Sequence, residues 1–87
     1  MQKTKLEMYV GVLKILDQND SVKTTNVAGS LNLRTYDLKI YLVFLLKQGL
    51  VEERKLSNYR VVYLITQRGR RVLKYFKKLK QELPIIG

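Results

Sequence analysis

Three short stretches of the chain carry side chains suited to binding anions and hydrogen-bond acceptors. Arg and Lys donate charge-assisted hydrogen bonds to phosphate oxygens and to guanine O6 and N7, and Thr, Asn and Tyr donate neutral ones. These side chains are typical of a surface that binds a polyanion, and double-stranded DNA is the partner that we expect. The candidate DNA-binding residues are Lys23, Thr24, Thr25, Arg34, Thr35, Tyr36, Lys39, Arg54, Lys55, Asn58, Tyr59 and Arg60.

The composition argues against catalysis and against a metal site. The chain has no Cys and no His, so it lacks the commonest metal ligands and the commonest general base. Its seven acidic residues are scattered along the sequence. Glu52 and Glu53 are adjacent in an expected strand, so they point to opposite faces and make a poor acid–base pair. We therefore expect no enzyme activity, no cofactor and no metal.

The chain of 87 residues has a formal net charge of +10, which is unevenly distributed. Residues 66–87 hold seven Lys or Arg and one Glu, whereas residues 1–22 are neutral. Such an excess indicates a polyanionic partner, which is DNA, RNA or an anionic membrane; the alternative is a solvated basic surface. No apolar run reaches the roughly 20 residues of a membrane span, and the N-terminus lacks the features of a signal peptide. We expect a cytoplasmic, DNA-associated protein.

The elements that must position these residues follow the order helix, link, helix, turn, helix, hairpin, helix, within one domain spanning residues 1–87. Apolar periodicity predicts helices over 5–18, 36–48 and 66–83, with a short helix before the third. We expect Thr24 or Thr25 to cap the second helix, Thr35 the third and Thr66 the last. β-branched and aromatic residues predict strands over 50–55 and 59–65, with the turn at 56–58. Residues 19–21 and Pro84 end the first and last helices.

The second and third predicted helices are joined by a tight turn that contains Asn32, as in a helix-turn-helix. In that motif the second helix of the pair presents its N-terminal half to base edges, and the first helix crosses the backbone. Gly49 follows the third helix, where a positive φ is cheap for glycine. The chain then turns into a hairpin that is expected beside the third helix, close to phosphates. The fold class expected is α+β, a winged helix-turn-helix with three helices, a β-hairpin wing and a C-terminal helix.

Two segments, YLVFLLKQGLVEE and YLITQRGRRVL, resemble the archaeal winged-helix regulators, above all the ten-kilodalton crenarchaeal DNA-binding proteins. The resemblance covers roughly residues 4–80 and implies binding of double-stranded DNA, often as a dimer joined by C-terminal helices in an antiparallel coiled coil. This chain departs from the family in its shorter last helix and in the apolar side chains of Ile40, Val43 and Phe44, where relatives tend to place acids. The matching positions are Tyr41, Leu42, Leu45, Leu46, Gly49, Leu50, Val51, Glu52, Tyr63, Thr66 and Gly69.

The last helix has an apolar seam with 4-3-4 spacing, surrounded by basic residues. The seam can pair with its copy in a dimer, dock on the first helix of the same chain, or lie on an anionic membrane. We favour a homodimer that uses the first and last helices, without a membrane. The interface residues expected are Leu6, Val10, Val72, Phe76, Leu79 and Leu83.

These features favour a sequence-dependent DNA-binding protein, a transcriptional regulator that acts as a homodimer. The alternative is a winged-helix module that binds another protein through Ile40, Val43 and Phe44. The same three residues could instead pack within the chain, against the hairpin or the first helix. RNA binding is a third hypothesis, without a visible RNA-binding signature.

Overall fold

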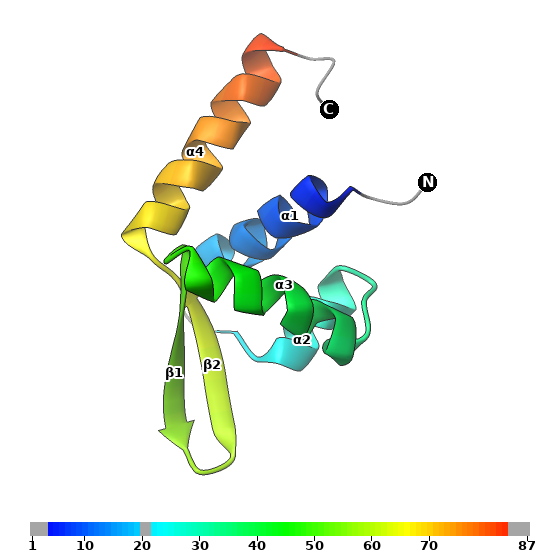
Figure 1. Cartoon of the computed structure of the whole chain (residues 1–87), viewed down its shortest axis with the longest axis vertical. Coiled ribbons are helices and arrows are strands. Elements are labelled where there is room, and N and C mark those ends of the chain that lie inside the picture. Colours follow the sequence, from blue (N-terminus) through cyan, green and yellow to red (C-terminus); the bar gives the residue numbers. More distant parts are fainter. Residues whose placement is uncertain (1–3, 20–21, 84–87) are drawn as a thin grey trace.

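The computed structural model describes residues 4–19 and 22–83. Most of the turn predicted at 19–21, and Pro84, lie outside these residues. The order of elements is the predicted one, and the α+β helix-turn-helix with a hairpin is confirmed (Figure 1). The elements are α1 (Lys5–Gln18), α2 (Thr24–Ser30), α3 (Thr35–Lys47), β1 (Val51–Ser57), β2 (Arg60–Ile65) and α4 (Gln67–Glu82).

The core lies between α1, α2, α3 and the base of the hairpin. Its apolar side chains recur at the three- and four-residue spacing of helices, as in Val12, Leu13 and Leu16 of α1 and Leu38, Leu42 and Leu45 of α3. All six are almost wholly buried. Because burying one such side chain stabilises the fold by about 1.5–3 kcal/mol, this set fixes how α3 sits on α1.

The N-caps of α2 and α3 differ from the prediction. Neither Thr24, Thr25 nor Thr35 caps a helix; the N-cap residues are Lys23 and Arg34, without side-chain capping hydrogen bonds. The Lys23 carbonyl accepts hydrogen bonds from the N–H groups of residues 26 and 27, so the helix begins at Thr24.

The two predicted turns that need a left-handed residue are confirmed. Asn32, between α2 and α3, has φ 60°, and Gly49, after α3, has φ 71°. The Gly49 N–H donates to the Leu46 carbonyl at 3.1 Å, and the Leu50 N–H donates to the Leu45 carbonyl at 3.0 Å. This paired pattern satisfies the last carbonyls of the helix. Since Leu50 takes part in ending α3, the strand begins at Val51, one residue later than predicted.

The hairpin is a two-stranded antiparallel sheet in which Val51 pairs with Ile65 and Ser57 pairs with Arg60. Its turn consists of residues 58 and 59, so the predicted turn at 56–58 is wrong. The register shifts between Lys55 and Ser57, which places an extra residue in β1 and lengthens that strand beyond residue 55. Beyond Val51, β1 is exposed, whereas β2 buries Val62, Tyr63 and Ile65.

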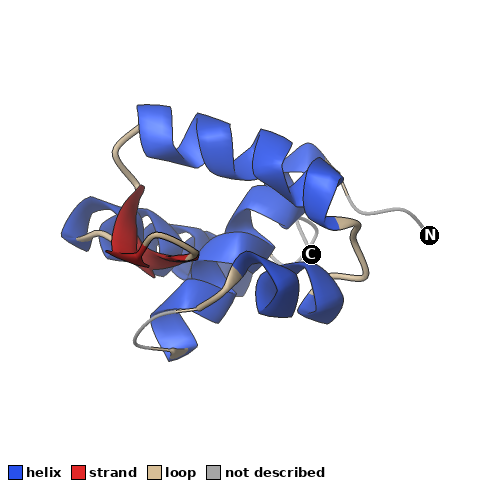
Figure 2. Ribbon diagram, turned by 90° about the horizontal axis from the view of Figure 1, so that it is seen from below, coloured by secondary structure: helices blue, strands red, loops and turns tan. Residues whose placement is uncertain are grey.

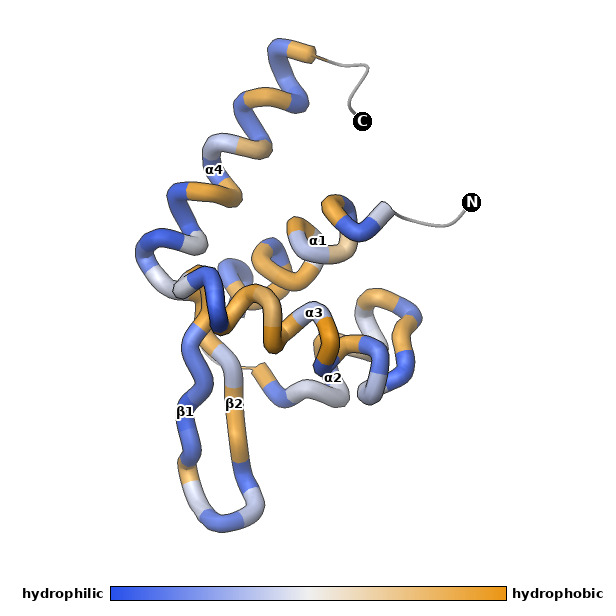
Figure 3. The backbone as a smooth tube through the Cα atoms, in the orientation of Figure 1, coloured by the Kyte–Doolittle hydropathy of each residue, from blue (hydrophilic) through white to orange (hydrophobic). Residues whose placement is uncertain are grey.

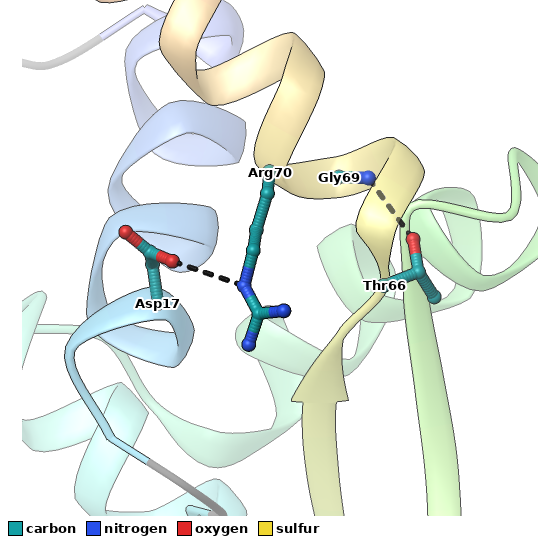
Figure 4. Close-up of polar contacts among 4 residues, drawn as sticks. All are labelled: Asp17, Thr66, Gly69 and Arg70. Carbon is teal, nitrogen blue, oxygen red and sulfur yellow. Dashed lines mark hydrogen bonds and ion pairs between the residues drawn. The ribbon is translucent and has the colours of Figure 1, made fainter.

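α4 begins close to the end of α3 and then leaves the body of the protein (Figure 1). The predicted cap Thr66 is confirmed: its hydroxyl accepts from the Gly69 N–H at 3.0 Å and donates to the Gly49 carbonyl at 2.7 Å. Arg70 Nε lies 3.3 Å from Asp17 Oδ1, so the start of α4 is also tied to the end of α1 (Figure 4).

Most side chains of α4 are exposed, and Phe76 and Leu79 are half-buried. Within this helix the structure buries Gly69 and Leu73. Polar and apolar segments alternate along its length (Figure 3). Across residues 4–19 and 22–83, no helix combines the length and apolarity that crossing a bilayer requires.

Candidate nucleic-acid interface

The start of α2 and the second strand of the hairpin meet around an open pocket of about 280 Å³. Five of the predicted DNA-binding residues line it, from two segments that are distant in the sequence. Cationic, hydroxyl and phenol groups therefore surround one depression, which suits the oxygen atoms of a phosphate. The lining residues are Lys23, Thr24, Thr25, Tyr59, Arg60 and Val61.

A short backbone bridge holds the two sides of this pocket together. The Val22 N–H donates to the Tyr63 carbonyl at 3.3 Å, and the Tyr63 N–H donates to the Val22 carbonyl at 3.1 Å. The sequence predicts an extended link at residues 22 and 23 but not this pairing with β2. A lone β-branched residue such as Val22, between a turn and a helix, is the signal that could have indicated it.

The Tyr63 side chain adds a polar contact behind the pocket. Its hydroxyl donates to Glu53 Oε2 at 3.0 Å, across the two strands. Burial, together with the hydrogen bond to Glu53 and the charge of that carboxylate, raises the pKa of Tyr63, and the Thr24 hydrogen bond opposes the shift. Glu52 lies on the other face of β1, where it pairs with Arg54, so the two acids do point apart as expected.

The predicted cations differ in whether they already have an acidic partner. Arg34 Nε lies 3.1 Å from Asp37 Oδ2, and Arg54 Nη2 lies 3.0 Å from Glu52 Oε1. Exposed pairs of this kind contribute at most about 1 kcal/mol, so a phosphate can compete for either arginine. Four other exposed cations have no ion pair with the described part of the chain: Lys23, Lys39, Lys55 and Arg60.

The outer face of α3 carries Tyr36, Lys39 and Ile40 in exposed positions and Thr35 half-buried. Tyr36 is 75% exposed and Tyr59 is 95% exposed, so neither covers an edge of the core. The residues at the hairpin turn gather with the start of α2 rather than with α3, in contrast to the expectation that the hairpin places them beside the third helix.

Ile40, Val43 and Phe44 were expected either to pack within the chain or to bind another protein, and the structure treats them differently. The Phe44 ring stacks on Tyr9 of α1 with 4.6 Å between ring centroids, so this residue packs within the chain. Ile40 and Val43 are exposed, and Phe44 keeps 42% of its surface exposed beside this ring contact. Intrachain packing therefore accounts for one of the three residues.

The residues predicted for a dimer interface lie on α1, on α4 and, for Leu83, at the C-cap of α4. Leu6, Val72 and Leu83 are exposed, whereas Val10, Phe76 and Leu79 are half-buried. Docking of α4 on its own chain is achieved by Leu73, a residue outside the predicted seam. Within the part of the chain that the structure describes, the seam is thus left largely uncovered. The same part contains no group of three or more potential metal-ligating side chains.

Several solved structures are similar to this chain. The transcriptional repressor CouR bound to a 23-mer DNA duplex is 27% identical, with a TM-score of 0.77 over 83% of this chain and 52% of that one. A Mycobacterium tuberculosis protein is 18% identical, with a TM-score of 0.76 over 91% of this chain and 56% of that one. Lactococcus lactis ZitR in complex with DNA is 17% identical, with a TM-score of 0.70 over 98% and 61%.

The chain thus spans little more than half the length of these structures. A comparison with curated proteins finds no match. A sequence model described as winged helix-turn-helix matches residues 2–83. Because that match extends over nearly all of the 87 residues, and the helix pair, hairpin and final helix are all present, the chain belongs to the winged helix-turn-helix family.

Proposed function

We propose that this protein binds double-stranded DNA and regulates transcription by occupying its site. The observation that carries the proposal is the pocket between α2 and the hairpin. It combines Lys23 and Arg60, two cations without an acidic partner in the described structure, with the hydroxyl groups of Thr24 and Thr25. Such a set is suited to a backbone phosphate and carries no information about base sequence.

In the proposed complex α3 enters the major groove, and the flanking elements contact the backbone. An α-helix fits the width of the major groove, and the N-terminal half of the second helix of the pair reaches the base edges. Arg34, Tyr36 and Lys39 are at that end of α3, where they would contact bases. Lys55 and Asn58 of the hairpin would contact phosphates. CouR and ZitR, which have similar folds, are both known in complexes with DNA.

Occupancy of a site requires neither catalysis nor a cofactor, and an intracellular, DNA-associated location follows from it. The motifs between Tyr41 and Glu52 support an archaeal origin within the winged-helix family, because they resemble the crenarchaeal proteins.

The test is the salt dependence of binding to duplex DNA. Fluorescence anisotropy of a labelled random-sequence duplex would be measured between about 50 and 200 mM salt, a range over which binding through several phosphates weakens by orders of magnitude. We expect a steep, linear decrease of log affinity with log salt concentration. An affinity that does not change over this range would contradict the proposal.

The proposed regulator acts as a homodimer joined through α1 and α4. Support comes from the apolar seam of α4, which is incompletely covered, and from Leu6 of α1, which is 54% exposed. A dimer would bury these side chains and would place two copies of α3 about one helical turn of DNA apart. Symmetric pairing of this kind is the commonest form of protein oligomer.

Two variants that each add one negative charge to α4 test the dimer. Leu79→Glu places a charge in the seam, and Gln81→Glu places one on the exposed opposite face. Sedimentation at micromolar concentration should give the mass of two chains for the wild type and for Gln81→Glu, but the mass of one chain for Leu79→Glu. A wild-type protein that sediments as a single chain would disprove the homodimer without affecting DNA binding.

A further inference from the structure

A stripe of three large side chains with mainly apolar surface runs along the outer face of α3. Tyr36, Ile40 and Val43 follow one another at spacings of four and three residues, so they share one face of the helix. Their exposed fractions are 75%, 60% and 49%. Phe44 is not part of the stripe, because its ring is held against Tyr9. A contiguous apolar surface on a small protein commonly marks a binding site.

The charges around the stripe restrict what can cover it. Lys39 lies beside Ile40, and Lys47 lies one turn beyond Val43 on the same face. Neither lysine has an ion pair in the described structure, so their positive charges remain uncompensated. A second copy of the same face would bring these cations together, which is unfavourable. The occupant must therefore combine negative charge at its edges with apolar groups between them.

The major groove of DNA has this combination. Phosphates line both rims, and the 5-methyl group of thymine is an apolar feature on the floor. Seen from the hairpin turn, α3 runs along one side of the molecule, with the hairpin and α2 beside it (Figure 2). The stripe thus belongs to the helix that the proposed function places in the groove.

We infer that Ile40 and Val43, together with the ring of Tyr36, recognise thymine through its 5-methyl group, and that these residues determine a preference for thymine at the base positions they contact. This inference rests on the proposed binding of DNA by α3. Hydrogen-bond donors on the same face are few, namely Tyr36 and the two lysines, so apolar contact supplies much of the discrimination among base pairs.

The experiment compares duplexes that differ by the methyl group alone. Binding of the full chain would be measured for an alternating A·T duplex of roughly 20 base pairs, about two helical turns, and for the same duplex with deoxyuridine in place of thymidine. Deoxyuridine keeps every hydrogen-bonding group in the groove. We expect the thymidine duplex to bind more tightly by about fourfold for each methyl group contacted, the factor that corresponds to burying one methyl group.

Two variants test whether the stripe causes the preference for the thymidine duplex. The double variant Ile40→Ala/Val43→Ala removes apolar volume at exposed helical positions, where alanine favours the helix. It should bind the two duplexes nearly equally. Arg60→Ala is the matched control: loss of a phosphate contact should weaken binding to both duplexes and leave their ratio unchanged.

Three results would overturn the inference, and they are distinguishable. Failure to bind either duplex would remove the proposed function and the inference with it. Equal wild-type affinity for both duplexes would leave DNA binding intact but exclude recognition of the methyl group. A wild-type preference that persists in Ile40→Ala/Val43→Ala would assign the preference to other residues and leave the stripe to a protein partner.

Discussion

The hairpin end and the α4 end of this protein are both basic, but they differ in what their cations surround. Residues 66–87 carry seven of the basic residues and one Glu, the largest concentration of charge in the sequence. In α4 these cations flank an apolar seam, whereas at the hairpin end Lys23 and Arg60 line a pocket with hydroxyl groups. The density of charge along a sequence therefore does not indicate whether its cations surround an apolar seam or a polar pocket.

The contact between the start of α4 and the base of the hairpin provides the prediction with the largest effect. A Cβ atom at Gly69 would collide with the Leu50 carbonyl oxygen and approach Ile65 Cγ1 to 2.8 Å, so α4 could not keep its place against the hairpin. We expect Gly69→Ala to lower the free energy of unfolding by roughly 3 kcal/mol, the upper part of the range for overpacking. Urea denaturation followed by circular dichroism would measure it.

Gly29→Ala is the control for this substitution, because nothing lies within 4 Å of the added Cβ and the position is helical. That variant should be unchanged or more stable, by up to about 1 kcal/mol. Equal stability of the two variants would mean that the close approach of α4 to Leu50 does not exist in solution.

A second prediction concerns discrimination between DNA sequences by α3, compared with α4. Lys39 is exposed on α3 and has no ion pair in the described structure. We expect Lys39→Ala to reduce the ratio of affinities for a selected duplex and a random one by roughly tenfold, since the proposed contact between Lys39 and a base would be lost. Lys74→Ala removes the same charge from α4 and should leave the ratio unchanged. Competition binding would compare the two, and an identical loss in both would refute the difference between the ends.

A third prediction separates two threonines at the N-termini of helices. Thr66 caps α4 and also donates to the Gly49 carbonyl, whereas Thr35 has no capping hydrogen bond. Replacing Thr66 with the isosteric Val should therefore lower the free energy of unfolding by about 1 kcal/mol. Thr35→Val should change it by less than about 0.5 kcal/mol. Thermal denaturation of both variants would check this, and a greater loss in Thr35→Val would reverse the assignment of the caps.

The smallest effect concerns the dependence of stability on pH. The pKa of Tyr63 is raised by burial and by Glu53, so above pH about 10 the folded protein retains a proton that the unfolded chain loses. This contribution is fully present below that pH and decreases as the pH rises through the folded pKa. Tyr63→Phe should therefore lose stability less steeply than the wild type above pH about 10.

Tyr59→Phe is the control for that comparison, because Tyr59 is almost fully exposed. Tyr59→Phe removes the same hydroxyl group from an exposed position, so comparing the two variants isolates the effect of the buried Tyr63. If the unfolding free energies of the wild type and of Tyr63→Phe changed with pH in parallel, the buried contact between Tyr63 and Glu53 would not persist in solution.

Much of the fold follows from local patterns in the sequence. The four helices, the hairpin, and the left-handed positions at Asn32 and Gly49 each depend on residues close to one another in the chain, so periodicity and turn chemistry predict them. The capping of α2 and α3 was predicted wrongly because both helices begin at a threonine and have Lys23 and Arg34 as N-caps, and propensity does not fix a helix boundary to a single residue. The bulge in β1, which moves the hairpin turn to residues 58 and 59, is likewise invisible in a propensity pattern.

The candidate site was predictable in its residue types but not in its arrangement. Lys23 and Arg60 were identified as cations near an expected helix-turn-helix, and their meeting around one pocket depends on the bridge between Val22 and Tyr63. That bridge joins segments distant in the sequence, so Val22 could indicate an extended residue but not its pairing with Tyr63. Similarly, the apolar residues of α3 are evident in the sequence, but that Phe44 packs on Tyr9 while Ile40 stays exposed is a result of tertiary structure.

The most direct test of the account is the slope of log affinity against log salt concentration for duplex binding. It would be measured for the wild type, for Lys23→Ala/Arg60→Ala and for Lys74→Ala/Lys78→Ala, two variants that remove the same charge. The account predicts that Lys23→Ala/Arg60→Ala lowers the magnitude of the slope by about 2 for each bound chain. The reason is that binding releases about one counterion fewer for each phosphate contact that is lost. The α4 pair should leave the slope unchanged. A larger decrease for the α4 pair than for Lys23→Ala/Arg60→Ala would contradict the assignment of the DNA-binding surface to the hairpin end.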